Sequence, residues 1–294
     1  MRWRSPVALA MIAACGGGGR TTSTVLVPER TATAGDALLA QLPAGAELLI
    51  EIDLARLRAN PVVGTVATEL LVAPPELVVA AAAPLGDASA LAMAAYRVGT
   101  PDATTITVVV GGERPAEAID LGGDRWALSV EGDVAAVLAA NDGGPSLAGD
   151  DRLLAVRAWA MPAAADAASL RLTARLPTAA RAQLAAALGI AAAPAVVSVW
   201  GDVADDLAVV VRLADEPAGD RRPEPPWLPA IGVLRDRVAA DAALAALGLA
   251  RPIAGAEIHR DDDGVRVAIL IAPGRLRRAV ERWRIQRGSP GVVP

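Results

Sequence analysis

The stretch AEIHRDDDGVRVAILI (residues 256–271) predicts two antiparallel strands joined by a tight turn. Its tip carries an Asp-Gly pair, which suits the short turns of β-hairpins. After the turn, apolar residues occupy alternate positions and therefore lie on one face of a strand: Val265, Val267, Ile269 and Ile271. We predict strands over 256–260 and 265–271, and the rest of the chain repeats this pattern.

Alternation bounded by turn residues predicts further strands along the chain. Three more hairpins are expected at 91–98 with 104–111, at 125–131 with 134–139, and at 196–201 with 207–213. Single strands are expected at 47–53 and 169–176. Apolar residues spaced by three and four predict helices at 54–71 (interrupted by Pro61), 115–119, 150–161, 177–188, 230–247 and 273–286.

These elements come in the same order twice, as β-α-β-β-α-β-β-α. The sequence therefore predicts an α+β fold of two tandem units, in which antiparallel hairpins pack against helices. We place the units at 36–164 and 165–294, each of a size that suits a domain. Asp36 is expected to cap the first helix.

Composition limits the classes of function. The chain is 53% hydrophobic, which is ample for a core, and its formal net charge is −5. An acidic chain of this kind does not favour nucleic-acid binding. The single cysteine cannot form an internal disulfide, so stability has to come from packing.

The N-terminus has the layout of a secretory signal peptide. A short basic start, MRWR, precedes an apolar run over 6–14 and then Cys15. The residues Ile12, Ala13, Ala14 and Cys15 resemble the lipobox of bacterial lipoproteins. This resemblance implies a signal peptide at 1–14, cleavage before Cys15, and a diacylglyceryl group on its sulfur. Residues 15–35 are predicted to form a flexible tether behind this lipid anchor.

An anchor of several acyl chains would hold the protein stably on a membrane without spanning it. Gly16 after the cysteine favours the outer membrane, with the protein facing the periplasm or the cell surface. The uncharged stretch 182–201 is long enough to cross a bilayer, but we interpret it as a helix followed by a strand. The stretch LPAGAELLIEIDLARLR (42–58) resembles uncharacterised envelope lipoproteins of GC-rich Gram-negative bacteria, which implies no particular activity.

Residues that carry catalysis are scarce. His259 is the only histidine, Cys15 is committed to lipid, and the chain has no lysine. A zinc site or a phosphate-binding loop with a lysine therefore cannot be assembled, and we expect no cofactor or metal. The acidic run 261–263 indicates a hairpin turn rather than a calcium site.

The strand 47–53 carries Glu51 and Asp53 on one face together with Glu47, and we expect its other face, with Leu48, Ile50 and Ile52, to point to the core. Three interpretations stay open for the carboxylates. The carboxylates are solvated, or they pair with Arg171 or Arg175 of the matched strand in the second unit, or they form the acid and base of a glycosidase.

The C-terminal helix is strongly basic. It carries the arginines 275, 277, 278, 282 and 284, and Trp283 belongs to an apolar stripe along it. Such a helix either docks by the stripe with its arginines solvated or paired with the acidic body, or presents a contact surface for anionic headgroups, lipopolysaccharide or an acidic envelope protein. The candidate contact residues are Arg275, Arg277, Arg278, Arg282, Trp283 and Arg284, with Trp227 in the Pro-rich joint 216–229 as a second feature.

Taken together, these features favour a lipid-anchored envelope protein that is not an enzyme and acts as a binding or scaffolding module. One alternative is a periplasmic carrier of lipid or another apolar ligand, since sheets covered by helices can enclose an apolar pocket. The other is a carboxylate-based hydrolase that uses Glu51 and Asp53.

Overall fold

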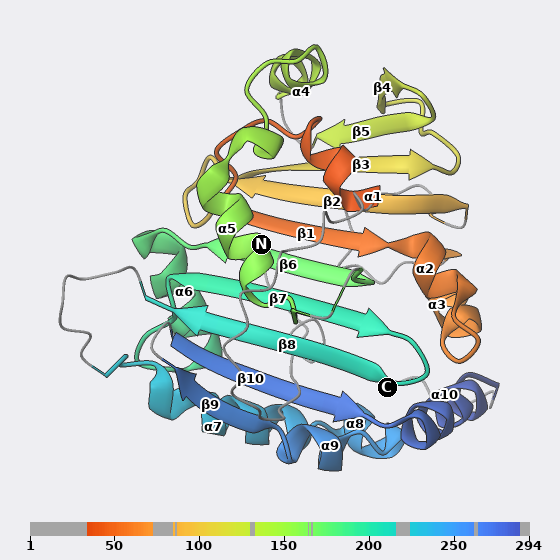
Figure 1. The fold of residues 1–294 in the computed structure, drawn as a ribbon, viewed down its shortest axis with the longest axis vertical. Helices are drawn as coiled ribbons and strands as arrows, with labels where there is room; N and C mark the ends of the chain where they lie inside the picture. The colour runs from red at the N-terminus through yellow and green to blue at the C-terminus, as the bar shows by residue number, and fades with distance from the viewer. Residues whose placement is uncertain are drawn as a thin grey trace.

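Ten antiparallel strands form one sheet in the computed structural model of this protein (Figure 1). The structure describes residues 34–72, 85, 87–129, 133–163, 165, 167–215, 224–261 and 264–288. The predicted signal peptide, the lipobox with Cys15 and nearly all of the predicted tether lie outside these residues, and so does most of the acidic run 261–263.

The strands follow the predicted alternation closely. Their order across the sheet is β4-β5-β3-β2-β1-β6-β7-β8-β10-β9. Their bounds are β1 Leu48–Asp53, β2 Ala88–Tyr96, β3 Thr104–Gly111, β4 Ile119–Gly122, β5 Arg125–Ser129, β6 Leu170–Arg175, β7 Val196–Val203, β8 Leu207–Ala214, β9 Glu257–Asp261 and β10 Gly264–Ile271.

The helices lie in the longer connections between these strands, before β1 and after β10. The break predicted at Pro61 is confirmed, because α2 ends before it and α3 begins after it. The helix predicted over 230–247 is divided by Asp241, whose carboxylate caps α8. The bounds are α1 Ala34–Leu39, α2 Leu54–Ala59, α3 Gly64–Val72, α4 Val134–Asn141, α5 Asp151–Trp159, α6 Thr178–Leu188, α7 Leu228–Ala239, α8 Ala242–Leu247, α9 Ala250–Ala254 and α10 Pro273–Gly288.

The two halves of the chain meet in the middle of the sheet, where β1 pairs with β6. Counted outward from this pair, both halves have the same strand order, since β1-β2-β3-β5-β4 on one side corresponds to β6-β7-β8-β10-β9 on the other. The α+β class is thus confirmed, and the halves share one sheet. Duplication of a unit remains a prediction, consistent with this order.

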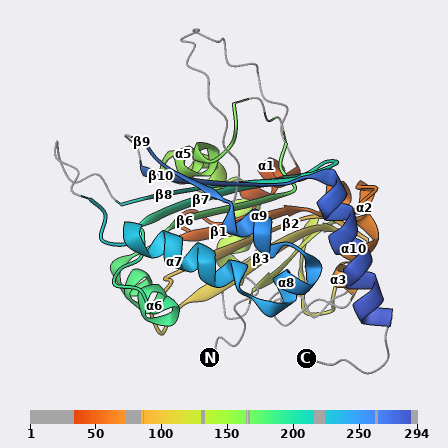
Figure 2. The ribbon, with the colours of Figure 1, turned by 90° about the horizontal axis from the view of Figure 1, so that it is seen from below.

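Helices cover the sheet on both faces (Figure 2). On one face, α1 and α5 lie over the central strands, and Leu38 and Leu42 pack there against Leu49 of β1. On the other face, α7 and α9 cover the half of the sheet that contains β8 and β10, with Trp227 and Ile253 in that core. No helix among the described residues is long and apolar enough to cross a membrane, and the stretch 182–201 contributes to α6 and β7.

Three details of the sequence interpretation are wrong. Residues 115–119 do not form a helix but lead by a turn into β4. Residues 134–139 are not the partner strand of β5; they belong to α4, because alanine favours helix over strand and the spacing of Val137 and Ala140 buries one helical face. Asp36 lies within the first turn of α1 and does not precede it.

Candidate functional site

The basic C-terminal helix α10 docks through its apolar stripe. Leu276 and Ala279 are each 5% exposed and Val280 is 9% exposed, and Leu276 and Val280 belong to the core beneath the sheet. Trp283 and Arg275 are half-buried. The side chains of Arg277, Arg278, Arg282 and Arg284 are exposed on the other side of the helix.

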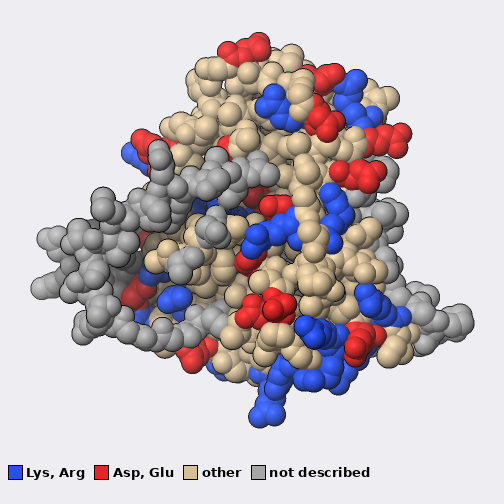
Figure 3. Space-filling view, turned by 45° about the vertical axis from the view of Figure 1, so that its right-hand side comes forward, with Lys and Arg blue, Asp and Glu red and all other residues tan. Residues whose placement is uncertain are grey.

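None of the arginines at 275, 277, 278, 282 and 284 forms an ion pair with a carboxylate among the described residues. The interpretation that they pair with the acidic body is therefore not supported. Arg282 lies against the C-terminal cap of α8, where Gly248 has a φ of +78° and a side chain would overlap the guanidinium. Basic side chains gather at the lower end of the molecule in the view of Figure 3, the end at which α10 lies in Figure 1.

Trp227 is not a surface residue, which corrects the sequence prediction. Its side chain is 1% exposed, and its indole N–H donates to Asp215 at 3.0 Å. The residue immediately precedes α7 and packs with Ile231 and Ile253 against the sheet. A tryptophan in a Pro-rich segment therefore serves the core here, because its large apolar ring and one N–H both find partners there.

A second surface was not predicted from the sequence. The outer face of α4 is made of apolar residues, of which Val134 is 43% and Leu138 is 41% exposed. The helix contains no charged residue. The sequence indicates this surface by the uncharged run VAAVLAAN (134–141), which we had interpreted in part as a strand.

The carboxylate of Glu51 lies in an ion-pair cluster beneath α5. Glu51 is 5% exposed and lies opposite Arg171 in the β1–β6 pairing, as the sequence suggested. The guanidinium of Arg157 on α5 donates to both carboxylate oxygens of Glu51 at 2.7 Å. Asp36 of α1 is 2.6 Å from Arg157 and 3.9 Å from Arg171. The cluster therefore joins α1 and α5 to the centre of the sheet.

This arrangement reverses the predicted faces of β1. Glu51 and Leu49 point to the face that α1 and α5 cover, whereas Leu48, Ile50 and Ile52 are half-buried on the opposite face. Burial disfavours the charged form of Arg157, but its hydrogen bonds to Glu51 and Asp36 and their negative charges outweigh burial and raise the pKa of the guanidinium. The positive charge thus stays in place throughout the physiological range.

The geometry does not support an acid and base pair at this strand. Asp53 is bound as the N-cap of α2, where it accepts from the backbone N–H of Arg56 at 2.8 Å. The hollow lined by Glu51, Asp53 and Arg171 has a volume of about 20 Å³, which is room for one water molecule. A sugar does not fit into such a space.

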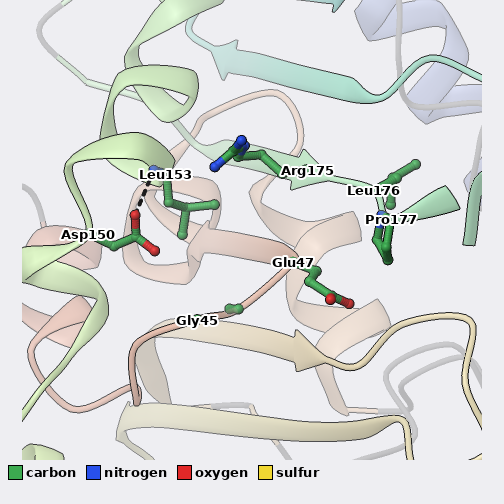
Figure 4. Close-up of a pocket in the computed structure, with 8 residues that line it drawn as sticks. Gly45, Glu47, Asp150, Leu153, Arg175, Leu176 and Pro177 are labelled. Atoms are coloured by element: carbon green, nitrogen blue, oxygen red, sulfur yellow. Dashed lines mark hydrogen bonds between the residues drawn. The ribbon is translucent and has the colours of Figure 1, made fainter. Parts of the chain in front are cut away.

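A larger pocket of about 290 Å³ lies at the junction of the halves. Figure 4 shows Arg175 of β6 on one side of it, Gly45 and Glu47 on the other, and Asp150 at the start of α5. Asp150 is committed to capping α5 through the N–H of Leu153. Charges of both signs line this pocket, so it gives no support to a carrier of apolar ligands.

His259 lies on the edge strand β9, where its Nε2 is 3.0 Å from the carboxylate of Glu257. Both side chains are more than half exposed, which is typical of a locally paired residue beside a turn. Among the described residues, no group of three or more His, Cys, Asp or Glu side chains is arranged to hold a metal ion.

The fold thus defines a class of protein built on one ten-stranded antiparallel sheet covered by helices on both faces. It is similar to the solved structures of TP0453, a protein of Treponema pallidum. Crystal form III shares 10% identity and covers 83% of this chain and 97% of that one, with a TM-score of 0.44. For crystal form I the values are 9%, 83%, 96% and 0.41. No family model and no curated protein matches the sequence. A likeness at this level says nothing about activity or partners.

Proposed function

We propose that this protein is a lipid-anchored envelope protein that is not an enzyme and that binds or scaffolds through the basic surface of α10. One observation carries the proposal. The helix is fixed by its buried stripe, while four exposed arginines have no acidic partner among the described residues. Four such charges on a rigid support form a preorganised contact surface for anions.

The chemistry of arginine favours a phosphate-bearing surface as the ligand. A guanidinium binds phosphate through two parallel hydrogen bonds and is weakly hydrated, so it pairs well at an interface. Arg277 and Arg284 are seven residues apart and therefore lie on the same face of the helix, about 10 Å from each other. The ligand is an extended anionic surface, such as lipid headgroups or lipopolysaccharide.

The test measures capture of anionic vesicles by the lipidated protein held in phosphatidylcholine vesicles. Each arginine near an anionic surface contributes about 1 kcal/mol. Replacing Arg277 and Arg284 by glutamine should therefore weaken capture about 30-fold. Raised salt should weaken capture by the unchanged protein, because exposed charges are screened.

The matched control replaces Arg152 of α5 and Arg251 of α9 by glutamine. Both are exposed, and the change in net charge is the same. If the control weakens capture as much as the α10 variant, net charge acts rather than this surface. Capture that is unchanged in both variants contradicts the proposal. Binding to an acidic protein but not to vesicles would also contradict it, and would replace anionic lipid by protein as the class of ligand.

A further inference from the structure

The outer face of α4 is apolar over the whole length of the helix. Val137 and Ala140 point inward and are buried, whereas the residues facing outward are exposed. A helix face without charge that exposes two large apolar side chains is suited to contact with another apolar phase. The exposed residues are Val134, Ala135, Ala136, Leu138 and Ala139.

This helix lies close to the point at which the chain leaves for its N-terminus. Val137 shares a core with Leu38 of α1. The segment after α1 is also bonded to the segment after α4, with Ala44 N–H donating to the Pro145 carbonyl at 3.3 Å and Leu147 N–H donating to the Leu42 carbonyl at 2.9 Å. The start of the described chain and α4 therefore belong to the same half of the sheet, with α1 over β1 and β2 and α4 beside the edge strand β4 (Figure 1).

The predicted lipid attaches only about 20 residues before α1, at Cys15. The tether that the sequence predicts there would reach roughly 25 Å on average. A bilayer that holds the lipid is thus within reach of α4. We infer that the outer face of α4 lies against this bilayer, with Val134 and Leu138 among the headgroups and upper acyl chains.

The size of the face fits a bilayer better than a second copy of the chain. A helix of eight residues is about 12 Å long. It offers far less than the roughly 800 Å² per partner that a stable dimer buries. A bilayer already tied to the protein needs only a small contact, because the lipid on Cys15 supplies a high effective concentration. The contact is apolar, so salt should not weaken it.

The contact would fix how the protein stands on the membrane. In their own halves α4 follows β5 and α10 follows β10, so the two helices occupy corresponding places at opposite ends of the sheet. Nine spacings between ten strands amount to about 43 Å along the sheet. With α4 on the anchoring bilayer, the arginines of α10 face away from it, toward a second surface.

The experiment uses the full lipidated protein in phosphatidylcholine vesicles. If Cys15 carries the lipid, a thiol-reactive NBD dye attaches only to a cysteine introduced by Leu138→Cys. The matched control is Val233→Cys on α7, which is also an apolar residue on a helix surface and is 55% exposed. Nitroxide-labelled lipid should quench NBD at residue 138 about twofold, in low and high salt alike, and leave residue 233 unchanged, since interfacial helices sit roughly 5–10 Å deep.

Val134→Cys serves as a second label, so that the result does not depend on one variant. Absence of quenching at both 134 and 138 in vesicles that carry the protein overturns the inference, as does equal quenching at 138 and 233. Lipid-independent self-quenching at 138 would assign the face to a second copy and also overturn it. Dye on the unchanged protein shows a free Cys15 and removes the anchor on which the inference rests. The arginines of α10 are tested separately, by vesicle capture.

Discussion

Replacing Arg157 by methionine should destabilise the fold by about 3–5 kcal/mol, because it leaves a buried carboxylate without its partner. The side chain of Glu51 is 6% exposed and that of Arg157 is 10% exposed. Arg157 donates two hydrogen bonds of 2.7 Å to Glu51 and lies 2.6 Å from Asp36. Methionine keeps most of the volume of arginine, so the variant removes the charge and these bonds more than it removes volume.

Equilibrium urea unfolding, followed by circular dichroism, measures the effect. Arg152→Met is the matched control on the same helix, where the side chain is exposed and a change should cost under about 0.5 kcal/mol.

The double variant Glu51→Leu and Arg157→Met isolates the cause. Replacing both members of a buried pair by apolar residues is often neutral, so it should recover most of the stability lost in the single variant. If Arg157→Met costs no more than Arg152→Met, the pair does not hold α5 on the sheet. If the double variant is as unstable as the single one, the buried charge is not the reason for the loss.

Two further variants probe contacts between the halves. Burial alone would raise the pKa of Asp202, but hydrogen bonds from Arg56 and Ser169 and the charge of Arg56 lower it, so the contribution of Asp202 to stability is present at neutral pH and lost as the pH falls below about 4. Asp202→Asn should therefore be less stable than the unchanged protein at pH 7, and this difference in stability should shrink in acid. A difference that stays constant in urea unfolding from pH 7 to pH 3 contradicts this prediction. Asn60 is 8% exposed and joins the turn between α2 and α3 to the end of β7 by four hydrogen bonds. Asn60→Ala should lower the free energy of unfolding by about 3 kcal/mol, whereas Asn141→Ala, at the end of α4, should hardly change it. Equal losses in the two variants would show that the bonds of Asn60 are unimportant.

Local patterns in the sequence determined most elements of this protein. Alternation and turn residues located nine of the ten strands, β4 being the exception, because hairpin pairing and turn chemistry are set by neighbours in the chain. The apolar stripe of α10 was likewise readable, since Leu276, Ala279 and Val280 follow the helical period. The lipobox at Cys15 depends on sequence alone and predicts the anchor.

Tertiary structure alone decided which surfaces are covered. A period of two shows that β1 has two faces but not which one α1 and α5 cover, and so Glu51 was expected outside and lies inside. Trp227 was expected at the surface because it lies in a Pro-rich segment, but residues distant in the chain, such as Ile253, bury it. The alanine-rich run of α4 favours a helix by propensity, but only packing decides that Val137 and Ala140 form its buried side. Only the joining of the halves at β1 and β6 places α4 and α10 at opposite ends, because that pairing links residues more than 100 positions apart.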